Sequence, residues 1–96
     1  MIELYQAEWC PYSHRVRQRL TELGVSFLAR QVPAESADRE ELRRKTGSDE
    51  IPALIDGEQV VVGDADELIG YLDRTYNERV DADEHRRQAE LHARAA

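Results

Sequence analysis

The chain has 96 residues, of which 41% are hydrophobic and 34% charged, so it corresponds to one small domain and excludes two separately packed ones. Its 20 acidic and 13 basic residues give a formal net charge of -7 at pH 7, and such a field repels nucleic acid. The apolar runs fall short of the ~20 residues that a membrane span needs, which excludes a transmembrane protein.

Cys10 is the only cysteine, so an intramolecular disulfide cannot form. With three histidines and no second thiol, the sequence also argues against a structural zinc site, and no metal ligand is assigned. The first five residues lack both the basic segment and the apolar stretch of a secretory signal. We therefore expect a cytoplasmic protein that packing alone stabilises.

The basic residues are unusual in kind, because Lys45 is the only lysine and all the others are arginines. A GC-rich genome explains the arginines, since arginine codons are GC-rich. Adaptation to a salt-loaded cytoplasm, as in halophilic archaea, explains the excess of carboxylates as well, and strong salt would screen the self-repulsion of the chain. Both explanations stay open.

The N-terminal segment predicts a strand followed by a helix. Residues 2–6 are rich in apolar side chains, and Pro11 suits the first position of a helix, where its missing N–H costs nothing. Gly24 marks the end of a helix over 11–23. Three apolar residues recur on one face of this helix: Val16, Leu20 and Leu23.

The next segment predicts a second strand and a charged helix. The strand covers 25–29 and ends before Pro33. The helix covers 36–45, with Leu42 and Ala37 facing inward.

Two apolar runs, 51–55 and 59–62, flank an Asp56-Gly57 turn, which is the signature of a β-hairpin. The apolar content of both runs predicts two well-buried strands.

Asp64 and Glu67 have the spacing of a capping box, in which Asp64 caps a helix over 65–76 and Glu67 reaches back. The apolar residues on one face of this helix are Leu68, Ile69, Leu72 and Tyr76. Residues 77–96 carry acids first and arginines later, which suits a helix dipole but offers almost no apolar face. We expect an exposed or fraying helix there.

The order of elements, β-α-β-α-β-β-α, predicts an α/β fold. Its sheet has four strands and is mixed, because a helical crossover joins the first two strands in parallel and the hairpin adds antiparallel ones. Three helices flank this sheet over residues 1–76, and residues 77–96 form a C-terminal helical extension.

Cys10 lies where the first strand meets the first helix. Unpaired N–H groups at a helix N-terminus stabilise a thiolate and lower its pKa, so the position favours a reactive thiol. Tyr12 and Ser13 place a ring and a hydroxyl beside it, and His14 and Arg15 add positive character. The alternative is a buried, inert cysteine.

The string Cys10-Pro11-Tyr12-Ser13 resembles the C-P-Y-C active-site motif of glutaredoxins, in a monothiol form. The longer run 10–17 is similar to the start of the glutaredoxin-like N-terminal domain of glutathione S-transferases. Residues 46–47 and then 51–57 resemble the region around the cis-proline of that family, and 62–66 its glycine-acid turn. The resemblance covers residues 1–76 and implies a thioredoxin-like fold.

This resemblance implies that Cys10 is the nucleophile that attacks a mixed disulfide. It also implies that Pro11, Tyr12 and Ser13 contact the bound thiol, and that Ile51, before a cis-Pro52, offers its backbone N–H and C=O to it like an added strand. An ordinary buried strand residue before a trans-proline is the alternative for Ile51.

The resemblance assigns the γ-glutamyl carboxylate of the thiol to the N–H groups of Gly63, Asp64, Ala65 and Asp66. Asp64 or Asp66 would pair with its amino group, although Asp64 can serve as a helix cap alone. Arg43 or Arg44 stands where the family often binds the other carboxylate; a solvated arginine is the alternative.

Two departures from the family bear on mechanism. Glutaredoxins commonly have a lysine shortly before the cysteine, whereas Ala7, Glu8 and Trp9 stand here, and Glu8 would repel a ligand carboxylate. The second cysteine of the motif is Ser13, so only the monothiol route remains.

The resemblance therefore implies a monothiol thiol–disulfide oxidoreductase that acts on thiolated proteins with glutathione or γ-glutamylcysteine, the thiol that halophilic archaea use, as co-substrate. We expect it to be a monomer. One alternative is a carrier of a [2Fe–2S] cluster, against which Pro11 counts, since carriers usually have a small residue there. The other is a stand-alone transferase-like domain that only binds thiol conjugates.

Overall fold

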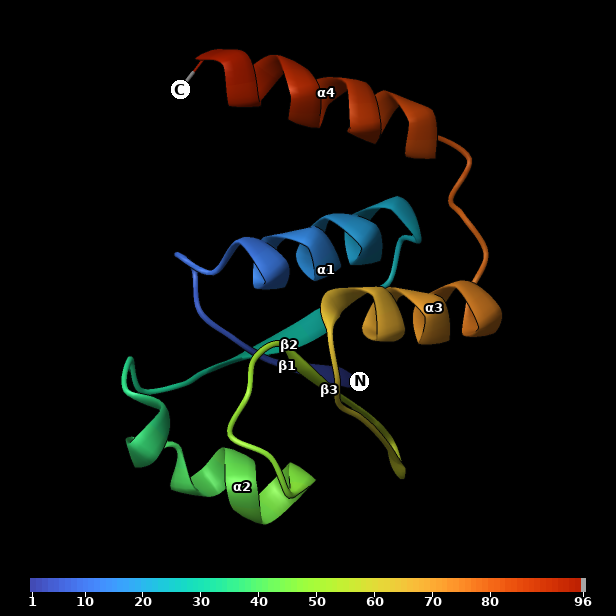
Figure 1. The fold of residues 1–96 in the computed structure, drawn as a ribbon. Helices are drawn as coiled ribbons and strands as arrows, with labels where there is room; N and C mark the ends of the chain where they lie inside the picture. Colours follow the sequence, from blue (N-terminus) through green and yellow to red (C-terminus); the bar gives the residue numbers. More distant parts are fainter. Residues whose placement is uncertain (96) are drawn as a thin grey trace.

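The computed structural model describes residues 1–95. Four strands form one mixed sheet in the order β2-β1-β3-β4 (Figure 1). β1 pairs in parallel with β2 and antiparallel with β3, and β3 pairs antiparallel with β4, as the order of elements predicts. The strands are β1 (Ile2–Gln6), β2 (Phe27–Gln31), β3 (Ala53–Asp56) and β4 (Gln59–Val61).

Helices cover both faces of this sheet. α1 and α3 lie together on one face and α2 lies on the other, while α4 lies beyond α1, away from the sheet (Figure 1). The predicted α/β architecture with three flanking helices and a helical extension is thus confirmed. The helices are α1 (Pro11–Glu22), the short 3-10 helix η1 (Ser36–Asp38), α2 (Glu40–Thr46), α3 (Ala65–Thr75) and α4 (Ala82–Ala95).

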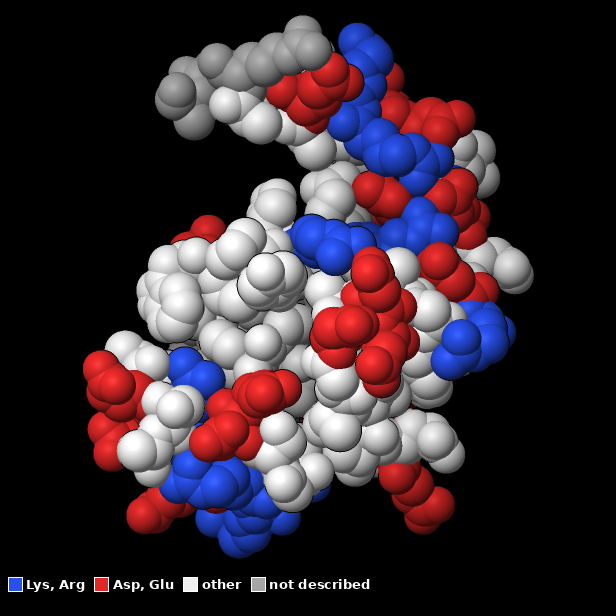
Figure 2. Space-filling model, viewed as in Figure 1, with Lys and Arg blue, Asp and Glu red and all other residues white. Residues whose placement is uncertain are grey.

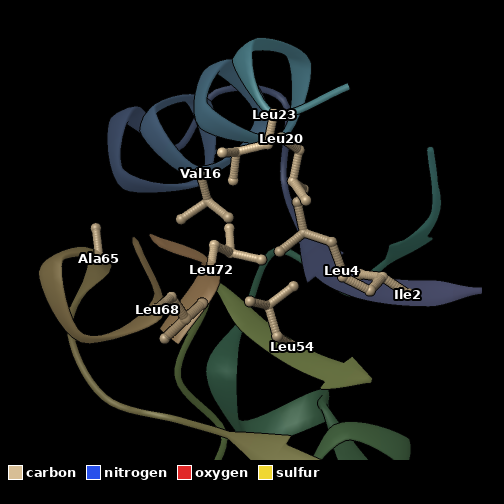
Figure 3. Packing of buried hydrophobic residues seen from close by; sticks show 9 residues of the cluster. All are labelled: Ile2, Leu4, Val16, Leu20, Leu23, Leu54, Ala65, Leu68 and Leu72. Atoms are coloured by element: carbon tan, nitrogen blue, oxygen red, sulfur yellow. The ribbon is translucent and has the colours of Figure 1, made fainter. Parts of the chain in front are cut away.

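The main core lies between the sheet and the pair α1 and α3. The predicted apolar faces of both helices supply it, and β1 and β3 add their inward side chains (Figure 3). Its buried members are Ile2, Leu4, Val16, Leu20, Leu23, Leu54, Ala65, Leu68 and Leu72. A smaller cluster of Tyr5, Leu42 and Ala53 packs α2 against the opposite face.

β2 begins two residues later than the sequence predicts. Arg30 and Gln31 pair with Tyr5 and Gln6 of β1, so the register with β1 sets the bounds of β2 rather than its apolar content. As an edge strand with one neighbour, β2 leaves four of its five residues exposed.

The predicted helix over 36–45 is interrupted at Arg39, whose φ of -86° and ψ of 60° are not helical. Its guanidinium binds the backbone carbonyls of Pro33, Ala34 and Asp49, which holds the chain in this bend. Leu42 is buried as expected, but Ala37 is exposed, so its inward placement is wrong.

β4 is not well buried, which corrects the prediction for the second strand of the hairpin. It is the other edge of the sheet, and Gln59 and Val60 are exposed. Val60 is 45% exposed although it is apolar, because an edge strand has a neighbour on one side only.

The C-terminal extension is held mainly by polar contacts. Its large apolar residues, Val80 and Leu91, are both exposed, and the exposure expected for this helix is confirmed. Only Ala82 is buried among those residues of α4 whose burial the structure describes. The backbone N–H of Arg79 donates to the carbonyl of Glu22, at 2.9 Å, and α4 follows alongside α1.

An ion-pair network joins α4 to the end of α1. The buried Glu22 carboxylate accepts from Arg19 at 2.7 Å and from Arg86 of α4 at 2.9 Å. Glu78 accepts from the same two arginines, at 2.6 and 2.7 Å. Two carboxylates and two guanidinium groups therefore alternate at this junction, which the sequence pattern could not reveal because the partners lie far apart in the chain.

The substitution Glu22→Gln should loosen α4 without unfolding the sheet. Burial raises the pKa of Glu22, but hydrogen bonds lower it by more, so the pKa lies below its ordinary value of 4.5. The arginine partners lower the pKa of Glu78 to about 2. Since both pKa values are lowered in the folded state, the contribution of these carboxylates is full above pH 4.5 and is lost as the pH falls toward about 2.

Hydrogen exchange of the amides in 82–95 measures this effect. The wild type should keep their protection at neutral pH and lose it in acid before the sheet unfolds, whereas Glu22→Gln should lose it already at neutral pH. Glu58→Gln, in the exposed hairpin turn, is the matched control and should behave as wild type. Equal protection in Glu22→Gln and wild type would show that the ion pairs do not hold α4.

Candidate active site

The loop after β1 places Cys10 at the N-terminus of α1. Cys10 is the capping residue, with an extended backbone, and Pro11 starts the helix as predicted. The thiol is buried, and its Sγ accepts a hydrogen bond from the backbone N–H of Ser13 at 3.4 Å. The sulfur thus occupies the position that an oxygen of serine or aspartate takes in most helix caps.

The surroundings of Cys10 favour the thiolate. Burial raises the pKa of the thiol, but the Ser13 hydroxyl and the backbone N–H groups of Ser13 and Tyr12 hydrogen-bond to the sulfur, and the charge of Arg17 adds to them. The pKa consequently lies below its ordinary value of 9.0. A lowered pKa raises the fraction of thiolate, the nucleophilic form, at neutral pH, so Cys10 is expected to be reactive although it is buried.

The Ser13 side chain links the thiol to the loop before it. Ser13 is fully buried, and its Oγ accepts from the backbone N–H of Ala7 at 3.4 Å, which leaves its own proton for the sulfur. The residue that replaces the second cysteine of the motif therefore helps to stabilise the thiolate.

Ser13→Ala should raise the pKa of Cys10, because it removes the hydroxyl that hydrogen-bonds to the thiolate. Alkylation of Cys10 should slow at neutral pH by a few fold, and its rate profile should shift to higher pH while the rate at alkaline pH stays near that of wild type. Measuring the alkylation rate against pH tests this. An unshifted profile would show that the hydroxyl does not act on the sulfur.

A groove of about 390 Å³ lies at the start of α1; residues on both sides of Cys10 in sequence line it, whereas the buried Cys10 itself does not. The two aromatic residues that flank the thiol in sequence form part of its wall, and both project into solvent, Trp9 being 66% and Tyr12 59% exposed. The groove brings together segments from α1, the loop before β3 and the start of α3. Its lining residues are Trp9, Tyr12, Arg39, Glu50, Ile51, Pro52, Gly63, Asp64 and Ala65.

Several residues singled out from the sequence meet in this groove. Tyr12 contributes from α1, and Ile51 and Pro52 contribute from the loop before β3, where the Ile51–Pro52 peptide bond is cis as the resemblance implies. Ile51 also packs against the cluster of Tyr5, Leu42 and Ala53, which anchors this wall to the sheet. Pro11 is exposed at the start of α1 and does not line the groove.

The start of α3 forms the far wall. Asp64 caps the helix, because its carboxylate accepts from the N–H of Glu67 at 2.9 Å, and Gly63 and Ala65 line the groove on either side of it. Gly63 has a φ of 127°, a backbone conformation that residues with a Cβ rarely adopt. This turn therefore requires glycine.

Asp66 does not share this position. Its carboxylate is exposed, pairs with Arg15 at 2.6 Å and does not line the groove. Of the two aspartates considered for a ligand amino group, Asp64 is the one that faces the groove. Asp64 already accepts the Glu67 N–H in the first turn of α3, so the N–H groups of Ala65 and Asp66 before it are the ones that a ligand carboxylate can bind.

The arginine in the groove is Arg39, which the sequence reading did not single out. Arg43 instead binds the carbonyls of Ser36 and Ala37, and neither it nor Arg44 lines the groove. Nothing in the hydropathy pattern separates these three arginines, since the bend that brings Arg39 to the groove depends on tertiary contacts. Glu50 also lines the groove and was not predicted from the sequence, whereas its neighbour Ile51 was.

In the part of the chain that the structure describes, residues 1–95, no three His, Cys, Asp or Glu side chains come close enough to hold a metal ion. None of the helices in this part combines the length and the apolar character that crossing a membrane requires.

A thiol with a lowered pKa at the start of α1, next to a groove lined by a cis-proline and a glycine-acid turn, is the arrangement of a thiol-based redox enzyme on a thioredoxin-like scaffold. The sequence profile of "Glutathione S-transferase, N-terminal domain" matches residues 4–80. Glutaredoxin 3 of Escherichia coli is 35% identical over 68 residues, which cover 70% of this chain and 80% of that protein. A glutaredoxin of Pseudomonas aeruginosa is 37% identical over 67 residues, covering 70% and 79%.

Among solved structures, a diazinon-metabolizing glutathione S-transferase of the silkworm Bombyx mori superposes with a TM-score of 0.71 at 24% identity. The superposition covers 80% of this chain and 38% of the transferase, so the chain spans well under half of that protein. This likeness confirms the thioredoxin-like fold. The chain belongs to the glutaredoxin family, and it is a glutaredoxin-type thiol oxidoreductase.

Proposed function

We propose that this chain is a monothiol oxidoreductase that reduces mixed disulfides between proteins and a γ-glutamyl thiol, either glutathione or γ-glutamylcysteine. The observation that carries the proposal is the placement of the only thiol of the chain, with a lowered pKa, beside a groove. The glutaredoxin relatives support the same chemistry.

The reaction proceeds by two thiol–disulfide exchanges. The Cys10 thiolate attacks the sulfur of the γ-glutamyl thiol in the mixed disulfide, a bond forms between these two sulfurs, and the protein thiolate leaves and takes up a proton. A second γ-glutamyl thiolate then attacks the same sulfur and displaces Cys10 as a thiolate. The net reaction consumes one free γ-glutamyl thiol: the protein thiol is released, this thiol and the γ-glutamyl half of the substrate form their disulfide, and the enzyme returns unchanged.

The groove offers complementary partners for the γ-glutamyl thiol. Its carboxylate would bind the free N–H groups at the start of α3, and its amino group would pair with Asp64. The peptide-like middle of the thiol would lie along the backbone of Ile51. In this orientation its sulfur would point toward the start of α1, where Cys10 lies.

The environment favours γ-glutamylcysteine, which lacks the glycine carboxylate of glutathione. Glu8 stands where glutaredoxins commonly have a lysine, and Glu50 and Asp64 add negative charge to the groove. The basic residue in the lining, Arg39, already binds three backbone carbonyls. A second ligand carboxylate would therefore meet repulsion.

A coupled thiol-transfer assay tests the proposal. A mixed disulfide of each γ-glutamyl thiol with a small neutral thiol serves as substrate, and the purified protein, expected to be a monomer by gel filtration, should reduce both. The kcat/KM should be higher with γ-glutamylcysteine. Absence of transfer with both thiols would overturn the proposed function, and an equal rate with both would overturn the preference.

A further inference from the structure

We propose that the protein half of the mixed disulfide is a basic segment, with arginine or lysine next to the thiolated cysteine. This inference rests on the proposed function and names the partner that the same groove selects. Trp9, Glu8 and Glu50, which the γ-glutamyl thiol does not require, carry it.

Two exposed aromatic rings stand on either side of Cys10 in sequence. Trp9 and Tyr12 both line the groove, yet well over half of each residue is exposed to solvent. Large rings that stay exposed at the mouth of a reactive site provide flat faces on which a guanidinium or ammonium group can stack. An arginine beside the substrate cysteine could stack on Trp9 or Tyr12, which lie one and two positions from Cys10 in the sequence.

Carboxylates surround these rings. Glu50 lines the groove and is exposed, and its carboxylate forms no ion pair with the residues that the structure describes. The Glu8 side chain is 88% exposed and touches Arg17 only at 3.4 Å. Figure 2 shows an uncharged area over the start of α1 that acidic clusters border, one over the start of α3 and another over the loop before β3.

Two of the three arginines nearby contact a carboxylate, and the third, Arg39, keeps its charge but is buried. Arg15 is paired with Asp66, Arg17 contacts Glu8, and the guanidinium of Arg39 is buried against backbone carbonyls. An incoming basic segment therefore meets aromatic faces, the unpaired carboxylate of Glu50 and the exposed carboxylate of Glu8, whereas an acidic one meets repulsion. The formal net charge of -7 acts in the same direction at long range, because it steers cationic partners toward the molecule.

Two thiolated peptides test this selection. They share one sequence except that two arginines flank the cysteine in one and two glutamates in the other, and both carry the same γ-glutamyl thiol. At low salt the basic peptide should react with a kcat/KM about tenfold higher, and the ratio should shrink as salt screens the charges. Glu50→Gln and Glu8→Gln should each reduce the ratio by about two- to fivefold, the range of an exposed ion pair.

The matched control is Glu58→Gln, which removes one exposed carboxylate from the hairpin turn and should leave the ratio unchanged. Trp9→Phe keeps an aromatic face and should retain most of the preference, whereas Trp9→Ala should lower it. Equal rates for the two peptides, or an equal loss in Glu58→Gln and Glu50→Gln, would overturn the inference.

The small neutral mixed disulfide separates the two proposals. If it is reduced while the peptides show no charge preference, the proposed function stands and this inference fails. If no disulfide is reduced, the inference is decided by binding instead: Trp9 is the only tryptophan, so its fluorescence reports directly on peptides in which serine replaces the thiolated cysteine. Binding of the basic peptide alone would support the inference, and identical titrations with both would overturn it.

Discussion

Replacement of Cys10 by serine should abolish thiol transfer and leave the fold intact. The thiolate is the nucleophile in both exchange steps, and a serine hydroxyl stays protonated at neutral pH, so turnover should fall by about 1,000-fold or more. Serine can still cap α1, because its oxygen accepts the Ser13 N–H that the sulfur now accepts. Turnover of the small mixed disulfide measures the loss, and circular dichroism checks the fold.

Ser13→Ala is the matched comparison for this loss. It changes a side chain in the same turn but keeps the thiol, so it should slow the reaction by only a few fold at neutral pH and approach wild type at higher pH. Substantial turnover in Cys10→Ser would mean that another group acts as the nucleophile, and the assignment of the site would fail.

Among the substitutions proposed for this protein, Leu54→Ala should lower the free energy of unfolding the most. Leu54 is fully buried in β3, a central strand, and packs between β1 and the helix α3 in the main core (Figure 3). Truncation removes three carbons and leaves a cavity that the surrounding leucines cannot fill, which lowers the free energy of unfolding by about 3 kcal/mol. Equilibrium unfolding in urea, monitored by circular dichroism, measures the change.

Val60→Ala is the control for Leu54→Ala, because it truncates an apolar side chain of the neighbouring edge strand β4 that is 45% exposed. Its effect should stay below about 1 kcal/mol. A similar loss in both variants would contradict the placement of the core between the sheet and the pair α1 and α3.

Local signals predicted most of the fold. Pro11 and Gly24 bracket α1, and the cap at Asp64 starts α3 where the spacing with Glu67 predicts it. Apolar periodicity identified the inward faces of both helices, since a buried helix face must repeat with the helical period. Each of these features depends on residues within a few positions of one another.

The features that sequence reasoning missed depend on distant partners. The bend at Arg39 is stabilised by carbonyls on both sides of it in the chain, including that of Asp49. β4 has an apolar sequence but lies at an edge, and strand order is not a local property. α4 is attached through Glu22 and Arg86, a pair separated by 64 positions.

The same distinction applies to the site. The resemblance placed Tyr12, Ile51 and Asp64 in one groove, because family motifs encode tertiary neighbours as well as local structure. The sequence predicts that Arg43 or Arg44 binds the ligand, but the arginine that lines the groove is Arg39. Local sequence could not distinguish these arginines, because the bend at Arg39 depends on tertiary contacts.

Mass spectrometry of Cys10 after exposure to γ-glutamyl disulfides tests the central claim most directly. The protein is incubated with the disulfide of glutathione or of γ-glutamylcysteine, with Cys10→Ser as control, and the intact mass is recorded. We predict a stable one-to-one mixed disulfide on Cys10, absent from the control and released by excess thiol. A thiol that forms no adduct and resists alkylation at neutral pH would contradict the claim, because it would make Cys10 a buried, inert cysteine.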